Sequence, residues 1–81
     1  MWIRSQNKYT LVKCNNVYAY YDGKIGKNII ATNDYSNVVI GFYSTKEKAL
    51  KVIDMIERHI IYLSGVFQMP QDDEVKDEKE N

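Results

Sequence analysis

Cysteine, proline and glycine are scarce in this chain of 81 residues, which contains one cysteine, one proline and four glycines. The single cysteine, Cys14, excludes a disulfide within the chain, and a lone thiol is typical of proteins from a reducing compartment. We therefore expect Cys14 to act as a small buried apolar residue rather than as a reactive group. A chain of this length without disulfides forms one domain near the lower limit of unaided stability.

Long apolar runs are also absent. The opening residues, MWIRSQNKYT, lack the apolar stretch of a signal peptide. No segment approaches the roughly 18 apolar residues that a membrane-spanning helix needs. We therefore expect a soluble protein of the cytoplasm, with no membrane partner.

Neither sign of charge is in excess, because 11 basic residues balance 11 acidic ones. The distribution is uneven: residues 71–81, QDDEVKDEKEN, hold six acidic residues and two lysines, which leaves residues 1–70 with a net charge of +4. Val75 is the only apolar residue of this acidic segment. We therefore expect one globular domain over residues 1–70 and a disordered acidic tail over residues 71–81. As an alternative, the tail pairs with the basic body or with a basic partner surface.

The first 43 residues are rich in strand-forming residues, and turn residues divide them into short runs. Asn15-Asn16, Asp22-Gly23 and the segment NDYSN at 33–37 supply the turns. The runs between them are KYTLVKC, VYAYY, NIIAT and VVIGFY, and WIRS adds one more at the start. Consecutive short strands with tight turns predict an antiparallel β-meander of about five strands.

Strict alternation of side chains along a strand assigns faces to two of these runs. In VYAYY, Tyr18 and Tyr20 lie on one face and Val17, Ala19 and Tyr21 on the other. In VVIGFY, one face carries Val38, Ile40 and Phe42, and the other carries Val39, Gly41 and Tyr43. Since small side chains let a helix approach closely, we expect a helix over Val17 and Ala19, with Tyr18 and Tyr20 left open.

The segment YSTKEKALKVIDMIERHI, residues 43–60, predicts one long amphipathic helix. Ser44 and Glu47 match a capping box, and Thr45 is the alternative N-cap. The expected apolar face consists of Ala49, Val52, Ile53, Ile56, Ile60 and Leu63. Gly65 fits the stop that follows a helix, and VFQM is compatible with a short terminal strand. The predicted fold class is α+β: a meander, then one helix, then a short strand.

Residue patterns that carry catalysis or bind metal are missing. The only histidine, His59, lies near the end of the predicted helix, where the helix dipole favours it as a structural residue. No Cys/His group has zinc spacing, and GFYSTK lacks the glycines of a phosphate-binding loop. We therefore expect no enzymatic activity, no catalytic residue, no metal and no cofactor.

Aromatic residues are abundant instead, with seven tyrosines, two phenylalanines and one tryptophan. Tyrosine is enriched at the centres of protein interfaces because it buries a large area at low entropic cost. The candidate partner-binding residues are Tyr18, Tyr20, Tyr43, Lys13 and Arg4. We expect a non-enzymatic binding protein that modulates a larger protein or associates with itself.

Nucleic-acid binding is the main alternative. The cations Arg4, Lys8, Lys13, Lys24 and Lys27 alternate with aromatic residues in the strand region. Aromatic platforms beside cations on an open sheet are a common way to hold single strands. The simpler interpretation is that these cations protect sheet edges and turns. A third and weaker option is a small nucleotide signal bound on the aromatic face.

Three segments of the chain, MWIRSQ, GFYSTKEKALKVIDMI and VFQMPQDDE, resemble small proteins encoded by phages and prophages of Gram-positive bacteria. The resemblance covers both ends of the body but not the middle segment, DGKIGKNIIATNDYSN. That group carries no assigned activity, so no functional residues are transferred from it. The resemblance implies a bacterial host cell and a protein that works by binding, with inhibition of a host defence system such as CRISPR as one such role.

Overall fold

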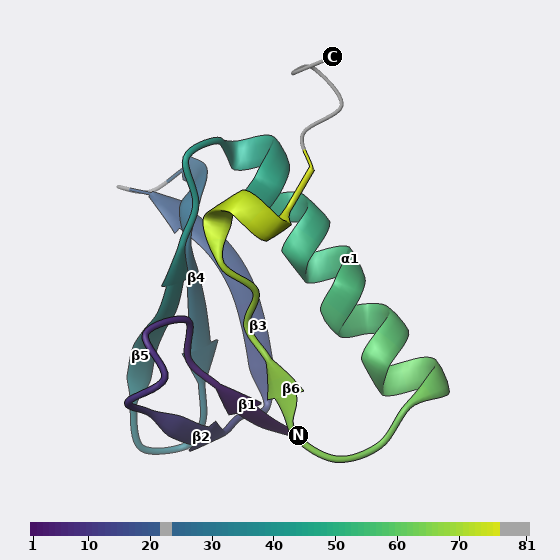
Figure 1. Ribbon diagram of the computed structural model, residues 1–81. Coiled ribbons are helices and arrows are strands. Elements are labelled where there is room, and N and C mark those ends of the chain that lie inside the picture. The colour runs from purple at the N-terminus through teal and green to yellow at the C-terminus, as the bar shows by residue number, and fades with distance from the viewer. Residues whose placement is uncertain (22–23, 77–81) are drawn as a thin grey trace.

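The computed structural model describes residues 1–21 and 24–76, with the side chains of 21 and 24–26 excepted (Figure 1). The predicted Asp22-Gly23 turn and residues 77–81 lie outside this description, as do the side chains of Tyr21 and Lys24. The described residues form an α+β fold, which confirms the predicted class. Its elements are β1 (Trp2–Arg4), β2 (Leu11–Lys13), β3 (Asn16–Tyr21), β4 (Lys24–Thr32), β5 (Asn37–Phe42), α1 (Lys46–Tyr62), β6 (Phe67–Gln68) and a 3-10 turn (Asp72–Glu74).

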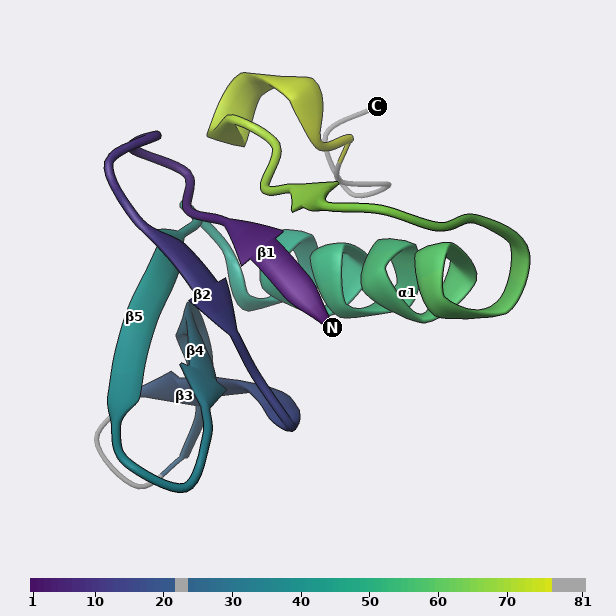
Figure 2. The same cartoon turned by 90° about the horizontal axis from the view of Figure 1, so that it is seen from below.

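The strands divide into two small sheets. The larger sheet is an antiparallel meander in the order β3-β4-β5. The smaller sheet has the order β2-β1-β6, in which β1 pairs antiparallel with β2 and parallel with the terminal strand β6. Both α1 and the smaller sheet lie on the same side of the meander (Figures 1 and 2). The meander therefore has one covered inner face and one outer face.

The core lies between the inner face of the meander, α1 and the smaller sheet. Its largest fully buried side chains are Tyr43, Ile3, Ile29, Ile40, Met69 and Val52. Val17 and Ala19 of β3 are partly buried against this core, whereas Tyr18 and Tyr20 are exposed. The expected placement of the helix over Val17 and Ala19 is confirmed.

Helix α1 begins after Thr45, whose side-chain oxygen accepts a hydrogen bond from the backbone N–H of Lys48 at 3.1 Å. Thr45, rather than Ser44, is therefore the N-cap. The helix ends at Tyr62, and Gly65 turns the chain with a φ of 87° a few residues later. His59 closes this turn, with its Nε2 3.0 Å from the carbonyl oxygen of Gly65 and its ring edge-on to Phe67.

The expected apolar face of α1 is only partly buried. Ala49, Val52 and Ile56 lie in the core, and Ile53 packs against it. Ile60 and Leu63, predicted to lie on the same buried face, are mostly exposed. These two side chains are exposed because the last turns of the helix extend away from the strands, as Figure 1 shows.

A β-bulge in β5 changes which side chains point inward. Ile30 pairs with Val39 and Ile29 pairs with Gly41, so Ile40 is an extra residue in β5. Because Ile40 and Gly41 both face the core, the alternation reverses after them. Phe42 therefore points outward and Tyr43 inward, which is the opposite of the strict alternation predicted from VVIGFY.

The first half of the acidic segment is ordered. Residues Asp72–Glu74 form a 3-10 turn, and Val75 is only 3% exposed. Asp72 accepts a hydrogen bond from the Ser44 backbone N–H at 2.7 Å and forms an ion pair with Lys48 at 3.4 Å. The expectation of disorder from residue 71 is therefore wrong for residues 71–76, because the Val75 side chain is buried and the Asp72 carboxylate bonds to residues of the body.

Candidate protein-binding surface

The structure separates the five candidate partner-binding residues into three places. Tyr18 and Tyr20 lie on the outer face of the meander. Arg4 and Lys13 lie on the exposed side of the smaller sheet. Tyr43 is fully buried, so its prediction as a surface residue is wrong. These residues therefore do not form one surface.

Three rows of paired side chains cross all three strands on the outer face of the meander; the row of Asn16, Thr32 and Asn37 is polar, and the other two carry the aromatic residues. One of these two rows is Tyr18, Ile30 and Val39, and the other is Tyr20, Asn28 and Phe42. We call these six residues the outer face. Neither row contains a charged residue. Their regular alignment follows from the antiparallel register, in which directly paired residues point to the same side of the sheet.

Four large side chains of the outer face are well exposed. The exposed fractions are 40% for Tyr18, 41% for Tyr20, 60% for Val39 and 54% for Phe42. The two tyrosine rings contact each other edge to face, with their centroids 6.2 Å apart. This contact holds both rings in a fixed position without covering them, and it leaves an apolar surface on a regular scaffold.

Val39 and Phe42 belong to this surface but were not among the predicted candidates. Strict alternation already separated Val39 from Ile40, so an outward Val39 agrees with the pattern. Phe42 reaches the outer face only because of the bulge at Ile40 and Gly41. A small Gly41 between two large residues is the sequence signal that could have indicated a bulge.

The smaller sheet has its own exposed side, which combines cations with apolar residues. Trp2 pairs with Lys13 and Arg4 pairs with Leu11, and all four side chains are exposed because Ile3 and Val12 between them point to the core. The Nε of Arg4 donates a hydrogen bond to the carbonyl oxygen of Lys8 at 2.8 Å. Arg4 therefore lies at the end of a tight turn, where it is held in place.

Tyr43 has a structural role below the surface. Its hydroxyl donates a hydrogen bond to the carbonyl oxygen of Pro70 at 2.8 Å. Burial raises the pKa of the Tyr43 hydroxyl above its usual value, and the negative charges of Asp72 and Glu74 raise it further. The hydroxyl therefore stays protonated and fastens the C-terminal segment to the end of β5.

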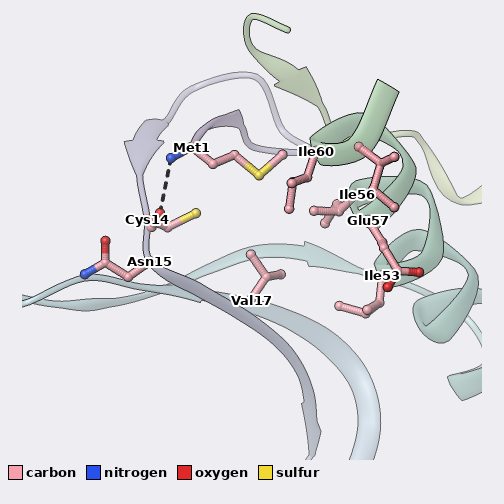
Figure 3. Close-up of a pocket in the computed structure, with 9 residues that line it drawn as sticks. Met1, Cys14, Asn15, Val17, Ile53, Ile56, Glu57 and Ile60 are labelled. Carbon is pink, nitrogen blue, oxygen red and sulfur yellow. Dashed lines mark hydrogen bonds between the residues drawn. The ribbon is translucent and has the colours of Figure 1, made fainter. Parts of the chain in front are cut away.

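A groove of about 470 Å³ opens between α1 and the start of β3 (Figure 3). Its walls include Val17 from β3, Ile53, Ile56 and Ile60 from α1, and also Met1, which precedes β1, and Cys14, which follows β2. Cys14 is buried, as predicted, and burial raises the pKa of its thiol, while the N-terminal ammonium group opposes this shift. The thiol is therefore a poor nucleophile at neutral pH.

Two further observations apply to residues 1–21 and 24–76. Their His, Cys, Asp and Glu side chains form no group of three or more that could hold a metal ion. Their only α-helix is too short and too polar to cross a bilayer.

Comparison with known proteins adds no relative to this description. No family model, no curated protein and no solved structure matches the chain.

Proposed function

We propose that this chain is a small non-enzymatic binding protein that docks onto a larger protein through its outer face. The observation that carries the proposal is the uncovered pair of rows with Tyr18, Tyr20, Val39 and Phe42 at their ends. Contiguous apolar surface of this kind marks interaction sites in soluble proteins. Exposed aromatic side chains and a lack of charge are the composition expected for the core of an interface.

The resemblance to small phage and prophage proteins supports a bacterial host protein as the partner. Within that proposal, the protein acts as an inhibitor of a defence system such as CRISPR. A folded surface that needs no chemistry suits this role, because occupying a partner's working surface is sufficient to block it. Expression in a host with active CRISPR immunity should then raise the plating efficiency of a targeted phage, and unchanged plating would reject this form of the proposal.

The direct test compares capture of host proteins by the wild type and by two matched double variants. Val39→Ser with Phe42→Ser removes apolar area from the outer face. Tyr9→Ser with Tyr35→Ser serves as the control, because these tyrosines are highly exposed and lie in turns outside the paired rows of that face. A partner that binds the outer face should be retained by the control and lost with the first variant.

The expected loss of affinity follows from the free energy that interface residues contribute to binding. Important interface residues commonly contribute about 2 kcal/mol each, so the Val39 and Phe42 variant should lose about 4 kcal/mol, which weakens binding by a factor of roughly 1,000. Lysates should be treated with nuclease so that nucleic acid cannot bridge two proteins. Equal capture by all three proteins would remove the outer face as the binding site.

Nucleic-acid binding is retained as a second candidate, on the exposed side of the smaller sheet. The observation that favours it is the placement of Trp2 beside Lys13, with Arg4 on the same side. Binding of single-stranded DNA should then fall steeply with added salt, and Lys13→Glu should weaken it. Absence of binding at low salt would eliminate this candidate.

A further inference from the structure

Strand β3 forms an edge of the meander, and this edge is unprotected. The order β3-β4-β5 leaves one side of β3 without a neighbouring strand. Within the described part of the chain, no hydrogen bond from outside the sheet reaches residues 16–20. Natural proteins usually protect such edges with charged residues, proline or a covering segment, and NVYAYY contains neither charge nor proline.

The other edges of the two sheets are protected in recognisable ways. At β5, the backbone N–H of Gln6 bonds to the Ile40 carbonyl at 2.8 Å, and the Gln6 side chain accepts from the Phe42 N–H at 2.9 Å. The β2 edge is three residues long and carries Lys13, whose carbonyl accepts from Asn33. β6 has only two residues. The free edge of β3 is the exception among these four.

We infer that β3 pairs with β3 of a second copy of this chain, which creates a continuous six-stranded sheet across a two-fold axis. Residues near a two-fold axis face their own copies, so a charged residue there would repel itself. The uncharged sequence of β3 is therefore compatible with self-pairing. Antiparallel edge pairing also satisfies the backbone groups that the free edge leaves open.

The register of this pairing is restricted by the two faces of β3. A shift by one residue would turn one meander over and expose Val17 and Ala19, so only registers that keep both inner faces on one side are compatible. Pairing centred on Ala19 places Tyr18 directly opposite Tyr20 of the partner subunit. Aromatic pairs across strands stabilise a sheet, which favours this register over its neighbours.

The groove beside β3 gives independent support. Ile60 and Ile61 are 63% and 62% exposed, and they line the groove together with Val17 of β3. The last turns of α1 thus carry apolar side chains next to the end of the free edge. In the register centred on Ala19, Val17 lies opposite residue 21 of the partner subunit, so the C-terminal end of the partner's β3 comes next to this groove. The dimer therefore pairs the open edge and brings the partner subunit to the side of the groove.

The test is a charge exchange at β3, followed by sedimentation equilibrium. The wild type should show a dimer of twice 9.5 kDa at about 100 μM. Tyr18→Lys with Tyr20→Lys places like charges opposite each other, and so does Tyr18→Glu with Tyr20→Glu. Each variant alone should dimerise at least tenfold more weakly, and an equimolar mixture of the two should recover the dimer. Recovery in the mixture also shows that both variants are folded.

A matched control variant shows whether dimerisation depends on the β3 edge or on any charge added to the outer face. Val39→Lys with Phe42→Lys adds the same charge to the same face but on β5, so the dimer should remain. A wild type that is monomeric at all concentrations would overturn the inference. The same result is expected if a strand of another protein, rather than a second copy of this chain, pairs with the edge. Unchanged dimerisation of the Tyr18→Lys, Tyr20→Lys variant, or loss of the dimer in the control, would also overturn it.

The groove is tested by one further pair of variants. Ile61→Glu and Leu63→Glu change residues of similar exposure, but only Ile61 lines the groove. Ile61→Glu should weaken the dimer and Leu63→Glu should not, and equal dimerisation would remove the groove from the interface. These results are independent of the proposed function, because the variant Val39→Ser with Phe42→Ser tests partner capture without changing β3.

Discussion

Replacing Tyr43 with phenylalanine should destabilise the fold through one hydrogen bond. The tyrosine is fully buried, and its hydroxyl donates to the Pro70 carbonyl at 2.8 Å. Phenylalanine keeps the ring and therefore the packing. It leaves the Pro70 carbonyl with only the longer bond from the Gln6 side chain, at 3.4 Å. The loss of the Tyr43 bond, which leaves this carbonyl with one long hydrogen bond, should cost about 1.5 kcal/mol.

The expected decrease in Tm is large for a domain of this size. A loss of 1 kcal/mol lowers Tm by about 4–8 °C in domains of 60–100 residues, so the variant should melt roughly 6–12 °C below the wild type. Thermal and urea denaturation followed by circular dichroism measure this change. Tyr35→Phe is the control, because Tyr35 is almost fully exposed and its loss should change stability by less than about 0.5 kcal/mol. Equal melting of the Tyr43→Phe variant and the wild type would refute the role of this bond.

The same residue makes a prediction for alkaline pH. The pKa of Tyr43 is raised in the folded state, so the hydroxyl keeps its proton in the fold after an unfolded tyrosine has lost it. This contribution to stability is complete below about pH 10 and is lost as the pH rises through the folded pKa. The free energy of unfolding should therefore fall less steeply above pH 10 in Tyr43→Phe. Identical slopes would contradict the assignment.

Three further substitutions test the packing around this segment. Gly41→Ala should cost about 1–2 kcal/mol, because a Cβ there would lie 3.0 Å from the Met69 methyl and 3.1 Å from the Tyr43 ring, and an unchanged Tm would show that the site has room. Val75→Ala should cost about 1–2 kcal/mol, whereas deletion of 77–81 should cost less, and the reverse order would contradict the docking of Val75. Asp72→Asn should cost about 0.5–1 kcal/mol at neutral pH, since this carboxylate is 41% exposed. The Ser44 N–H, followed by Lys48, lowers the pKa of Asp72, so its contribution is present above about pH 4 and is lost as the pH falls through the folded pKa. Acid titration of both proteins should show that the difference disappears.

The local elements of this fold could be predicted because local sequence determines them. The start of α1 needs only a hydroxyl before an amphipathic run, and the choice between Ser44 and Thr45 lies within one residue. The outward direction of Tyr18 and Tyr20 followed from alternation, together with the small size of Val17 and Ala19. Each of these inferences depends on neighbours within a few positions.

The inferences that failed depend on contacts between distant parts of the chain. Tyr43 points inward because the bulge in β5 lets it reach Pro70, and no alternation rule contains that information. Composition predicted disorder from residue 71, but Val75 and Asp72 fit particular sites on a folded body. The same limit explains why Phe42 was missed as part of the candidate site.

The parallel pairing of β6 with β1 has a consequence for the order of folding. Ile3 and Phe67 are partners in the smaller sheet although nearly the whole described chain lies between them. Closing so long a loop costs entropy before any contact repays it, whereas the hairpins of the meander and α1 need only local contacts. We expect β3-β4-β5 and α1 to form early in biosynthesis and the smaller sheet to form last. During that interval Ile3 and Val12, which are buried in the finished fold, stay accessible, so the nascent protein is most exposed to proteases and to aggregation at its N-terminus.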